Sequence, residues 1–264
     1  MSLPVARFSF EDFPALDSLL HTPCRAIARH FMLSAERYGA LYKSLVEMGV
    51  HLVVEPEAYE RAHYYPCAYP ALASMTPAVK CPRAAWIAFE PEAIPRKDLE
   101  KMVAEIAAWP CSKVVIKDFV KSAKEAGQRF MHASVDEELP DLIGEFVKVR
   151  GRRFNRGVVL KELKSLECYR AHGEFVTNEW RLWFIQGKLQ VATPNSFQPD
   201  SAAKVPEVVL AAAAHAAETI ASPYLTIDVA EGTGAWIVLE AGDGGVSGSS
   251  PYQDMAEHWM QLAR

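Results

Sequence analysis

The spacing of hydrophobic residues divides the first hundred positions into helices and strands. Residues 35–48 carry apolar side chains at helical spacing, and Ser34 is placed to cap the start of this helix. Short hydrophobic runs at 50–54 and 86–89 predict buried strands. A further helix is expected from Pro95. Its predicted inner face consists of Leu99, Met102, Val103 and Ile106. The alternation predicts an α/β organisation for this part of the chain.

Residues 59–82 interrupt the pattern. They are rich in Pro, Tyr and His and follow neither a helical nor a strand period, so an ordered loop is expected there. Pro110 ends the preceding helical pattern, and we expect a domain boundary near residue 110.

The second part of the chain is predicted to contain more strands than helices. The expected strands are 113–118, 158–163, 179–185, 189–193, 224–229 and 235–240. The expected helices are 135–149, 206–220 and 253–262. A turn at Gln186-Gly187-Lys188 would join the third strand to the fourth.

Composition narrows the class of protein. The 264 residues include 50% hydrophobic and 23% charged positions, which excludes a disordered or fibrous chain. A formal charge of −5 disfavours a protein whose whole surface binds nucleic acid, so no nucleic-acid partner is expected. No apolar run reaches the ~18 residues of a membrane span, so no membrane partner is expected. The five cysteines contain no C-x-x-C pair, which indicates a reduced, cytoplasmic protein.

A first candidate site is the basic segment KDFVKSAK at the end of a predicted strand. Lys117, Lys121 and Lys124 could hold phosphate oxygens as point charges. The glycines of a P-loop are missing. The alternative is a solvated basic helix start, since charge runs often only face water.

A second candidate site combines GVVLKEL with NEWRLWFIQGKL. The backbone of Glu162 and Leu163 could reach the edge of a purine, and Glu179 could accept a hydrogen bond from a ribose hydroxyl. Arg181 shares a strand face with Glu179. The alternative is a cross-strand ion pair between these two residues on an exposed sheet face.

A third candidate site contains the carboxylates Asp228, Glu240 and Asp243. They lie at the ends of two strands that a hairpin joins, so they could converge on Mg²⁺, which prefers oxygen ligands. The alternative is that Asp228 caps a turn and that Asp243-Gly244 is a simple turn.

The order and spacing of these three groups resemble the ATP-grasp superfamily, and in detail its clade named for one arginine and two lysines. The closest matches are VVIKDFVKS, VVLKEL and EGTGAWIVLEAGDGGVSG. The resemblance implies an α/β fold of α+β lobes. It places an N-terminal pre-ATP-grasp segment at 1–110 and an ATP-grasp domain at 111–264, with a nucleotide lobe over about 111–163 and a metal-binding lobe over about 164–264.

The resemblance also implies a role for each candidate residue, with ATP and Mg²⁺ as cofactors. Lys117 would contact the α- and β-phosphates, assisted by Lys121, and Lys161 would reach the nucleotide from the hinge. Glu162 and Leu163 would present backbone groups to adenine. The remaining roles are ribose binding by Glu179, contact of Arg181 with the γ-phosphate or acyl-phosphate, and magnesium binding by Asp228, Glu240 and Asp243.

The sequence departs from the pattern of the superfamily at two positions. Gly242 stands where many members carry an asparagine two residues after the metal-binding glutamate, so the third ligand is assigned to Asp243. Thr226 stands where a basic residue often precedes the metal-binding aspartate.

The activity implied by the resemblance is that of an ADP-forming carboxylate–amine ligase acting through an acyl-phosphate, with small-molecule or peptide substrates. Lys117 and Arg181 would be its catalytic residues. Two alternatives stay open: an ATP-dependent phosphotransferase on a small molecule and a non-catalytic nucleotide-binding module. Candidate acceptor contacts are His63, Tyr64, Tyr65, Tyr69, Arg152, Arg153 and Arg156, each of which could instead serve packing or a solvated lid.

Overall fold

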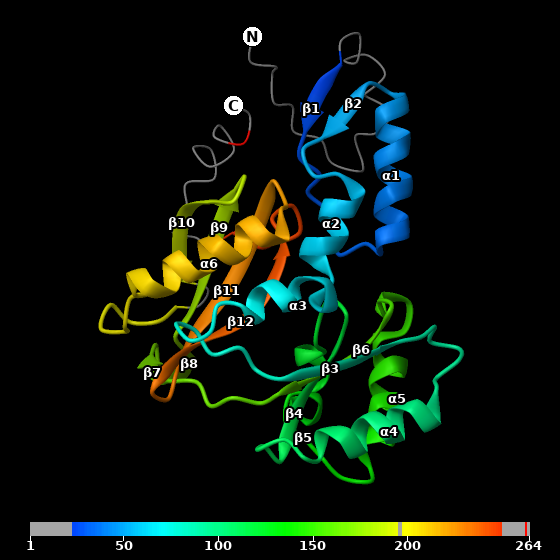
Figure 1. Ribbon diagram of the computed structural model, residues 1–264, viewed down its shortest axis with the longest axis vertical. Helices are drawn as coiled ribbons and strands as arrows, with labels where there is room; N and C mark the ends of the chain where they lie inside the picture. Colours follow the sequence, from blue (N-terminus) through cyan, green and yellow to red (C-terminus); the bar gives the residue numbers. More distant parts are fainter. Residues whose placement is uncertain (1–22, 195–196, 250–261, 263–264) are drawn as a thin grey trace.

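The computed structural model describes residues 23–194, 197–249 and 262, and it contains two four-stranded antiparallel sheets (Figure 1). We call them the upper and lower sheets from their places in Figure 1. The upper sheet has the order β10 (Lys188–Pro194), β9 (Glu179–Ile185), β11 (Tyr224–Gly232), β12 (Ala235–Asp243). The lower sheet has the order β3 (Ala84–Ala88), β6 (Gly157–Glu162), β4 (Lys113–Asp118), β5 (Ala133–Ser134).

Helices α4 (Arg96–Ile106) and α5 (Leu139–Arg150) cover the lower sheet. The predicted inner face of α4 is confirmed, because all four of its residues are buried in a core shared with β4, β6 and α5. Gly157 allows β3 and β6 to approach closely, since a Cβ there would lie 2.2 Å from the carbonyl oxygen of Ile87. Strand β3 and helix α4 precede the predicted boundary near residue 110, but they share a sheet and a core with elements that follow it. The division at residue 110 remains a prediction.

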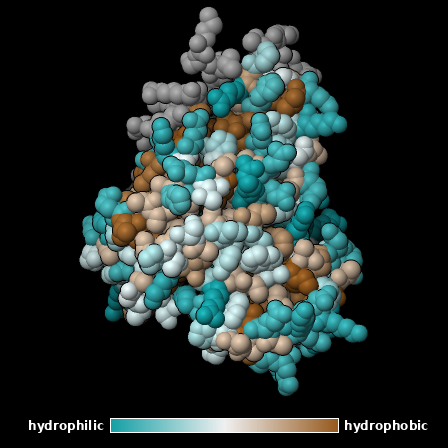
Figure 2. All heavy atoms as spheres, viewed as in Figure 1, coloured by the Kyte–Doolittle hydropathy of each residue, from teal (hydrophilic) through white to brown (hydrophobic). Residues whose placement is uncertain are grey.

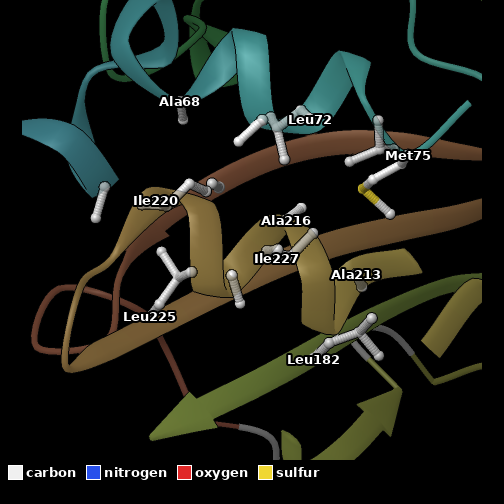
Figure 3. Packing of buried hydrophobic residues seen from close by; sticks show 14 of the residues in the cluster. Ala68, Leu72, Met75, Leu182, Ala213, Ala216, Ile220, Leu225 and Ile227 are labelled. Carbon is white, nitrogen blue, oxygen red and sulfur yellow. The ribbon is translucent and has the colours of Figure 1, made fainter. Parts of the chain in front are cut away.

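Helix α6 (Glu207–Ile220) covers one face of the upper sheet and is itself covered by α3 (Tyr65–Ala73). Figure 3 shows this packing: Leu72 and Met75 of the α3 region lie over the small and branched side chains of α6, with Leu225 and Ile227 of β11 beneath. Alanines on α6 permit the close approach of the two helices. The core therefore ties the N-terminal part of the chain to the upper sheet.

The N-terminal part of the chain consists of β1 (Cys24–Ala26), α1 (Ala35–Glu47), β2 (Val50–Leu52), α2 (Pro56–His63) and α3. Helix α1 begins as expected, with the Ser34 hydroxyl accepting from the Arg37 N–H at 3.3 Å. The parallel pairing of β1 with β2 was not predicted.

The prediction of a loop at 59–82 was wrong, because α2 and α3 occupy most of it. Both are short, begin with a proline in the first turn, and α3 carries Pro70 inside. Their buried residues contact several elements, so apolar side chains are not confined to one face of either helix. The periodic spacing that predicts an amphipathic helix is therefore missing.

The other predicted elements within the described residues are confirmed, with shifts of a few residues at their ends. The hairpin of β7 (Cys168–Ala171) and β8 (Glu174–Thr177) was not predicted. Of the predicted helix at 253–262, only residue 262 is described. In the described part of the chain, no helix is long and apolar enough to cross a membrane. On the face seen in Figure 2, hydrophobic residues form small patches among hydrophilic ones.

Candidate functional site

An ion pair between Lys117 and Glu240 connects the two sheets. Lys117 lies on β4 of the lower sheet and Glu240 on β12 of the upper sheet, and their Nζ and Oε2 atoms are 2.8 Å apart. The Lys117 side chain is 5% exposed, whereas that of Glu240 is 44% exposed. The carboxylate is therefore open to a ligand while the lysine is enclosed by protein.

Lys161 joins the same contact from the neighbouring strand β6. Lys117 is paired with Val159, so Lys161, two residues further along β6, lies on the same face of the lower sheet. Its ammonium group donates to the backbone carbonyl of Leu239 on β12. Burial, followed by the nearby charge of Lys117, lowers the pKa of Lys161 to about 8.

The ring of Tyr65, at the start of α3, lies against both lysines. The distances from its ring centroid to the ammonium nitrogens of Lys117 and Lys161 are 4.8 and 5.4 Å. Electron-rich ring faces attract cations, so Tyr65 stabilises two like charges close together. Tyr65 was expected as a candidate acceptor contact, and its contact with the lysines was not predicted.

Arg181 and Asp228 form a second ion pair beside Glu240. The guanidinium donates from Nε and Nη2 to the two carboxylate oxygens of Asp228, at 2.8 and 2.7 Å. Asp228 on β11 is directly paired with Arg181 on β9 and with Glu240 on β12. These three predicted residues therefore lie side by side on one face of the upper sheet.

Glu179 lies two residues before Arg181 on that face, and its Oε1 accepts from the Thr177 hydroxyl at 2.6 Å. The alternative expectation was an exposed ion pair between Glu179 and Arg181. It is wrong, because Arg181 pairs with Asp228 and the Arg181 side chain is only 17% exposed.

The surrounding cations keep Glu240 ionised. Burial alone would raise its pKa, but Lys117, Lys161 and Arg181 together lower the pKa of Glu240 to about 2. Two buried lysines and an arginine thus face two carboxylates at the contact between the sheets. Such a set can bind a polyanion and a divalent cation together by exchanging protein partners for ligand atoms.

Asp243 lies apart from this cluster. It pairs with Leu225, whose side chain lies in the core beneath α6, whereas Glu240 pairs with Asp228 on the opposite face. Burial raises the pKa of Asp243 to about 7, against the hydrogen bonds from the backbone. Among the described residues no group of three or more His, Cys, Asp or Glu side chains could hold a metal ion, so the three predicted ligands are not brought together.

The backbone N–H groups of Glu162 and Leu163, which were expected to face adenine, already donate hydrogen bonds inside the protein. That of Glu162 donates to the carbonyl of Arg83 at 2.8 Å, and that of Leu163 donates to the carbonyl of Lys113 at 3.2 Å. A purine contact through these groups would require both hydrogen bonds to be exchanged.

A buried ion pair holds the turn after β4, where Lys121 lies. Asp118 accepts from the backbone N–H groups of Val120 and Lys121 through Oδ1 and from Arg150 Nε through Oδ2, the last at 2.8 Å. Neither residue of the Asp118–Arg150 pair was predicted to form it. Their pairing depends on how α5 packs on the lower sheet, for which no local sequence signal exists.

The arginines of the loop after α5 are dispersed. Arg156 pairs with Glu36 at 2.9 Å, and Arg152 and Arg153 are exposed. The described side chains therefore do not show an arginine fork at the cluster.

Comparisons with known proteins find one family and a shared fold. A model described as an ATP-grasp domain, family 3 of the clade named for one arginine and two lysines, matches residues 91–262. A search of the curated proteins finds no match.

Three solved structures illustrate the likeness. The RimK-domain ATP-grasp protein from Sphaerobacter thermophilus is 16% identical, with a TM-score of 0.55 over 90% of this chain and 78% of that chain. D-alanyl-alanine synthetase A from Vibrio cholerae is 11% identical, with a TM-score of 0.56 over 90% and 75%. The macrocyclase MdnC bound with precursor peptide MdnA, from Microcystis aeruginosa, is 13% identical, with a TM-score of 0.52 over 90% and 76%. At such identities the structures establish the fold alone.

Proposed function

The chain belongs to family 3 of the ATP-grasp clade named for one arginine and two lysines, and from this premise we propose that it is an ATP-dependent, ADP-forming carboxylate–amine ligase. The observation that carries the proposal is the convergence of Lys117 and Lys161 from the lower sheet with Arg181, Asp228 and Glu240 from the upper sheet. D-alanyl-alanine synthetase A, by its name, joins two amino-acid units, and MdnC binds a peptide, which suggests amino-acid or peptide substrates.

The lysines would hold the phosphates of ATP. Lys117 would exchange Glu240 for the α- and β-phosphates, Lys161 would exchange the Leu239 carbonyl, and Lys121 would contribute from the turn after β4. On the upper sheet, Glu179 would hold the ribose. Glu162 and Leu163 would meet adenine at the end of β6.

Asp228 and Glu240 fit a magnesium ion. They are directly paired carboxylates, and Glu240 is ionised and 44% exposed, so its oxygens are accessible to a hard cation. Bound Mg²⁺ would neutralise the charge of the phosphate oxygens. Asp243 is not part of this proposal because it lies on the opposite face of the sheet.

The reaction has two steps. An oxygen of the substrate carboxylate attacks the γ-phosphorus, and the bond to the β-phosphate oxygen breaks to release ADP. The nitrogen lone pair of the amine then attacks the acyl carbon, inorganic phosphate leaves with its electron pair, and the amine loses a proton. Arg181 would stabilise the negative charge on the transferred phosphoryl group after it is released from Asp228.

ADP release with paired substrates tests the activity. Amino acids and short peptides are supplied singly and in pairs with Mg²⁺ and ATP, and products are identified by mass. We expect release only when a carboxylate and an amine are both present, with a product lighter than their sum by one water. Lys117→Ala should abolish the release.

Two results would contradict the ligase. ADP release with a single hydroxyl compound and formation of a stable phosphate ester would indicate a phosphotransferase. Saturable ATP binding without release in any mixture would indicate a nucleotide-binding module.

A further inference from the structure

The four side chains at 63–69 that were candidates for acceptor binding fall into two groups. The Tyr64 hydroxyl donates to Asn155 Oδ1 at 3.0 Å and accepts from the Ala35 N–H at 2.9 Å, and the Tyr69 hydroxyl donates to the carbonyl of Pro82 at 3.4 Å. These two tyrosines serve packing. In contrast, His63 Nε2 and the Tyr65 hydroxyl are buried without any hydrogen-bond partner among the described residues.

Unpartnered buried polar atoms are rare because each costs free energy of desolvation without a compensating hydrogen bond. His63 is 4% exposed and Tyr65 is 2% exposed, so bulk water does not satisfy them. Two such atoms lie two residues apart in the sequence, and both can donate a hydrogen bond to a ligand: the Tyr65 hydroxyl, and His63 Nε2 in the tautomer that carries its proton on Nε2.

The Tyr65 side chain lies at the Lys117–Glu240 contact, and His63 precedes it by two residues. The Tyr65 ring packs against Lys117 at 4.8 Å and against Lys161 at 5.4 Å. Burial, followed by the charges of His30 and Lys117, lowers the pKa of His63 to about 3, while Glu240 acts in the opposite direction. His63 is therefore a neutral imidazole within electrostatic range of the ion pair, and both members of that pair are proposed ligand contacts.

The backbone at this junction is held in place. Helix α2 ends at His63 and α3 begins at Tyr65, with Tyr64 extended between them. The Tyr65 N–H donates to the Phe119 carbonyl, in the turn after β4, at 2.7 Å. The imidazole of His63 stacks on Tyr59 with ring centroids 4.6 Å apart. A ligand would thus meet donors that are already oriented, which reduces the entropy lost on binding.

The charges nearby select the ligand. A phenol and a neutral imidazole N–H donate hydrogen bonds, and the ammonium groups of Lys117 and Lys161 attract anions, so the position suits a carboxylate. The same two ammonium groups would repel the cationic amine substrate. The junction also lies before residue 91, outside the matched family domain, so the N-terminal part of the chain would contribute it.

We propose that His63 Nε2 and the Tyr65 hydroxyl bind the substrate carboxylate beside Lys117, as hydrogen-bond donors that orient its oxygen for phosphorylation. The inference rests on the proposed ligase function; it selects two of the four candidate contacts at 63–69 and assigns both to the substrate carboxylate. Tyr65 then has two roles: its ring supports the lysines and its hydroxyl contacts the substrate.

Acetate provides a direct probe because it is the smallest group with the required chemistry. ¹³C-labelled acetate is titrated into the full chain saturated with Mg²⁺ and ADP, so that the phosphate position is filled, and its line width and chemical shift are followed. Tyr65→Phe removes only the hydroxyl, and His63→Phe keeps a ring against Tyr59. We expect saturable acetate binding by the wild type and a loss of affinity of about tenfold in each variant.

Tyr64→Phe and Tyr69→Phe are the matched controls and should bind acetate as the wild type does. The affinity for Mg²⁺ and ADP should be unchanged in Tyr65→Phe, and its thermal stability should not fall, since the lost hydroxyl has no partner among the described residues of the unliganded protein. Absence of saturable acetate binding, or equal affinity in wild type and both variants, would overturn the inference. Failure to bind Mg²⁺ and ADP in the wild type would instead refute the proposed function, so the two failures are distinguishable.

Discussion

Lys161 is the residue of the cluster whose charge should depend on pH near neutrality. Its pKa is about 8 because burial and the neighbouring charge of Lys117 disfavour the ammonium form. In the proposed site the phosphates of ATP would favour that form, so the pKa of Lys161 would rise when ATP binds. The affinity for ATP is then constant below pH 8 and falls above it, by up to about tenfold per pH unit, because binding must first restore the lost proton.

Calorimetric dissociation constants for Mg²⁺ and ATP between pH 7 and 9.5 test this expectation. Lys161→Arg is the control, because arginine stays charged throughout this range. The affinity of this variant for Mg²⁺ and ATP should change little with pH. The same pH slope in the wild type and in Lys161→Arg would show that Lys161 does not hold the nucleotide.

The residues that form the cluster were predicted from the sequence, but the unpartnered polar atoms of the neighbouring His63 and Tyr65 were not. Lys117, Lys161, Arg181, Asp228 and Glu240 meet as their order along the chain suggested. Asp243 lies apart from the cluster for a simple reason: three positions along a strand reverse the face of the sheet, so residues close in sequence need not share a face. The unpartnered atoms of His63 and Tyr65 depend on packing and left no sequence pattern.

Among the elements, strand β4 and helix α5 are fastened together by the Asp118–Arg150 pair. The two side chains are 0% and 8% exposed, and removal of one would leave the other buried without its partner. Asp118→Asn and Arg150→Met should each lower the free energy of unfolding by about 3 kcal/mol or more. The double variant should lose less than the sum of the two, because neither charge is then left alone.

Urea denaturation of the wild type, the two single variants and the double variant measures these free energies of unfolding. Glu145→Gln is a suitable control, since Glu145 pairs with Arg129 at a half-exposed position of the same helix and should change the stability little. Additive losses in the double variant would mean that the two residues stabilise the protein independently.

The elements that sequence periodicity predicts best are those with one buried face. Helix α4 is buried on one side only, and its inner residues were identified correctly. Helices α2 and α3 are short and proline-rich and contact several layers, so their burial follows from tertiary packing. The β7–β8 hairpin was missed because its turn, His172-Gly173 with φ values of 50° and 87°, is formed by a histidine in an uncommon left-handed conformation.

In the molecule as a whole, the upper and lower sheets meet through charges. Lys117 and Lys161 reach from one sheet to β12 of the other, and Tyr65 of the N-terminal part closes the contact. The net charge of −5 therefore does not describe the site, in which basic and acidic groups from the two sheets are paired. In the proposed function, ligand binding would replace these pairs, so the same residues would stabilise the unliganded protein and bind the nucleotide.

Calorimetric titration of ATP, with and without Mg²⁺, tests whether the cluster holds the nucleotide. The proteins are wild type, Lys117→Ala, Glu240→Ala and the control Lys113→Ala, which changes an exposed lysine on the same strand as Lys117. Lys117→Ala should weaken ATP binding about tenfold or more under both conditions, and Glu240→Ala should weaken it only when Mg²⁺ is present. Lys113→Ala should match the wild type. Equal affinities in all four proteins would contradict the assignment of the cluster as the nucleotide site.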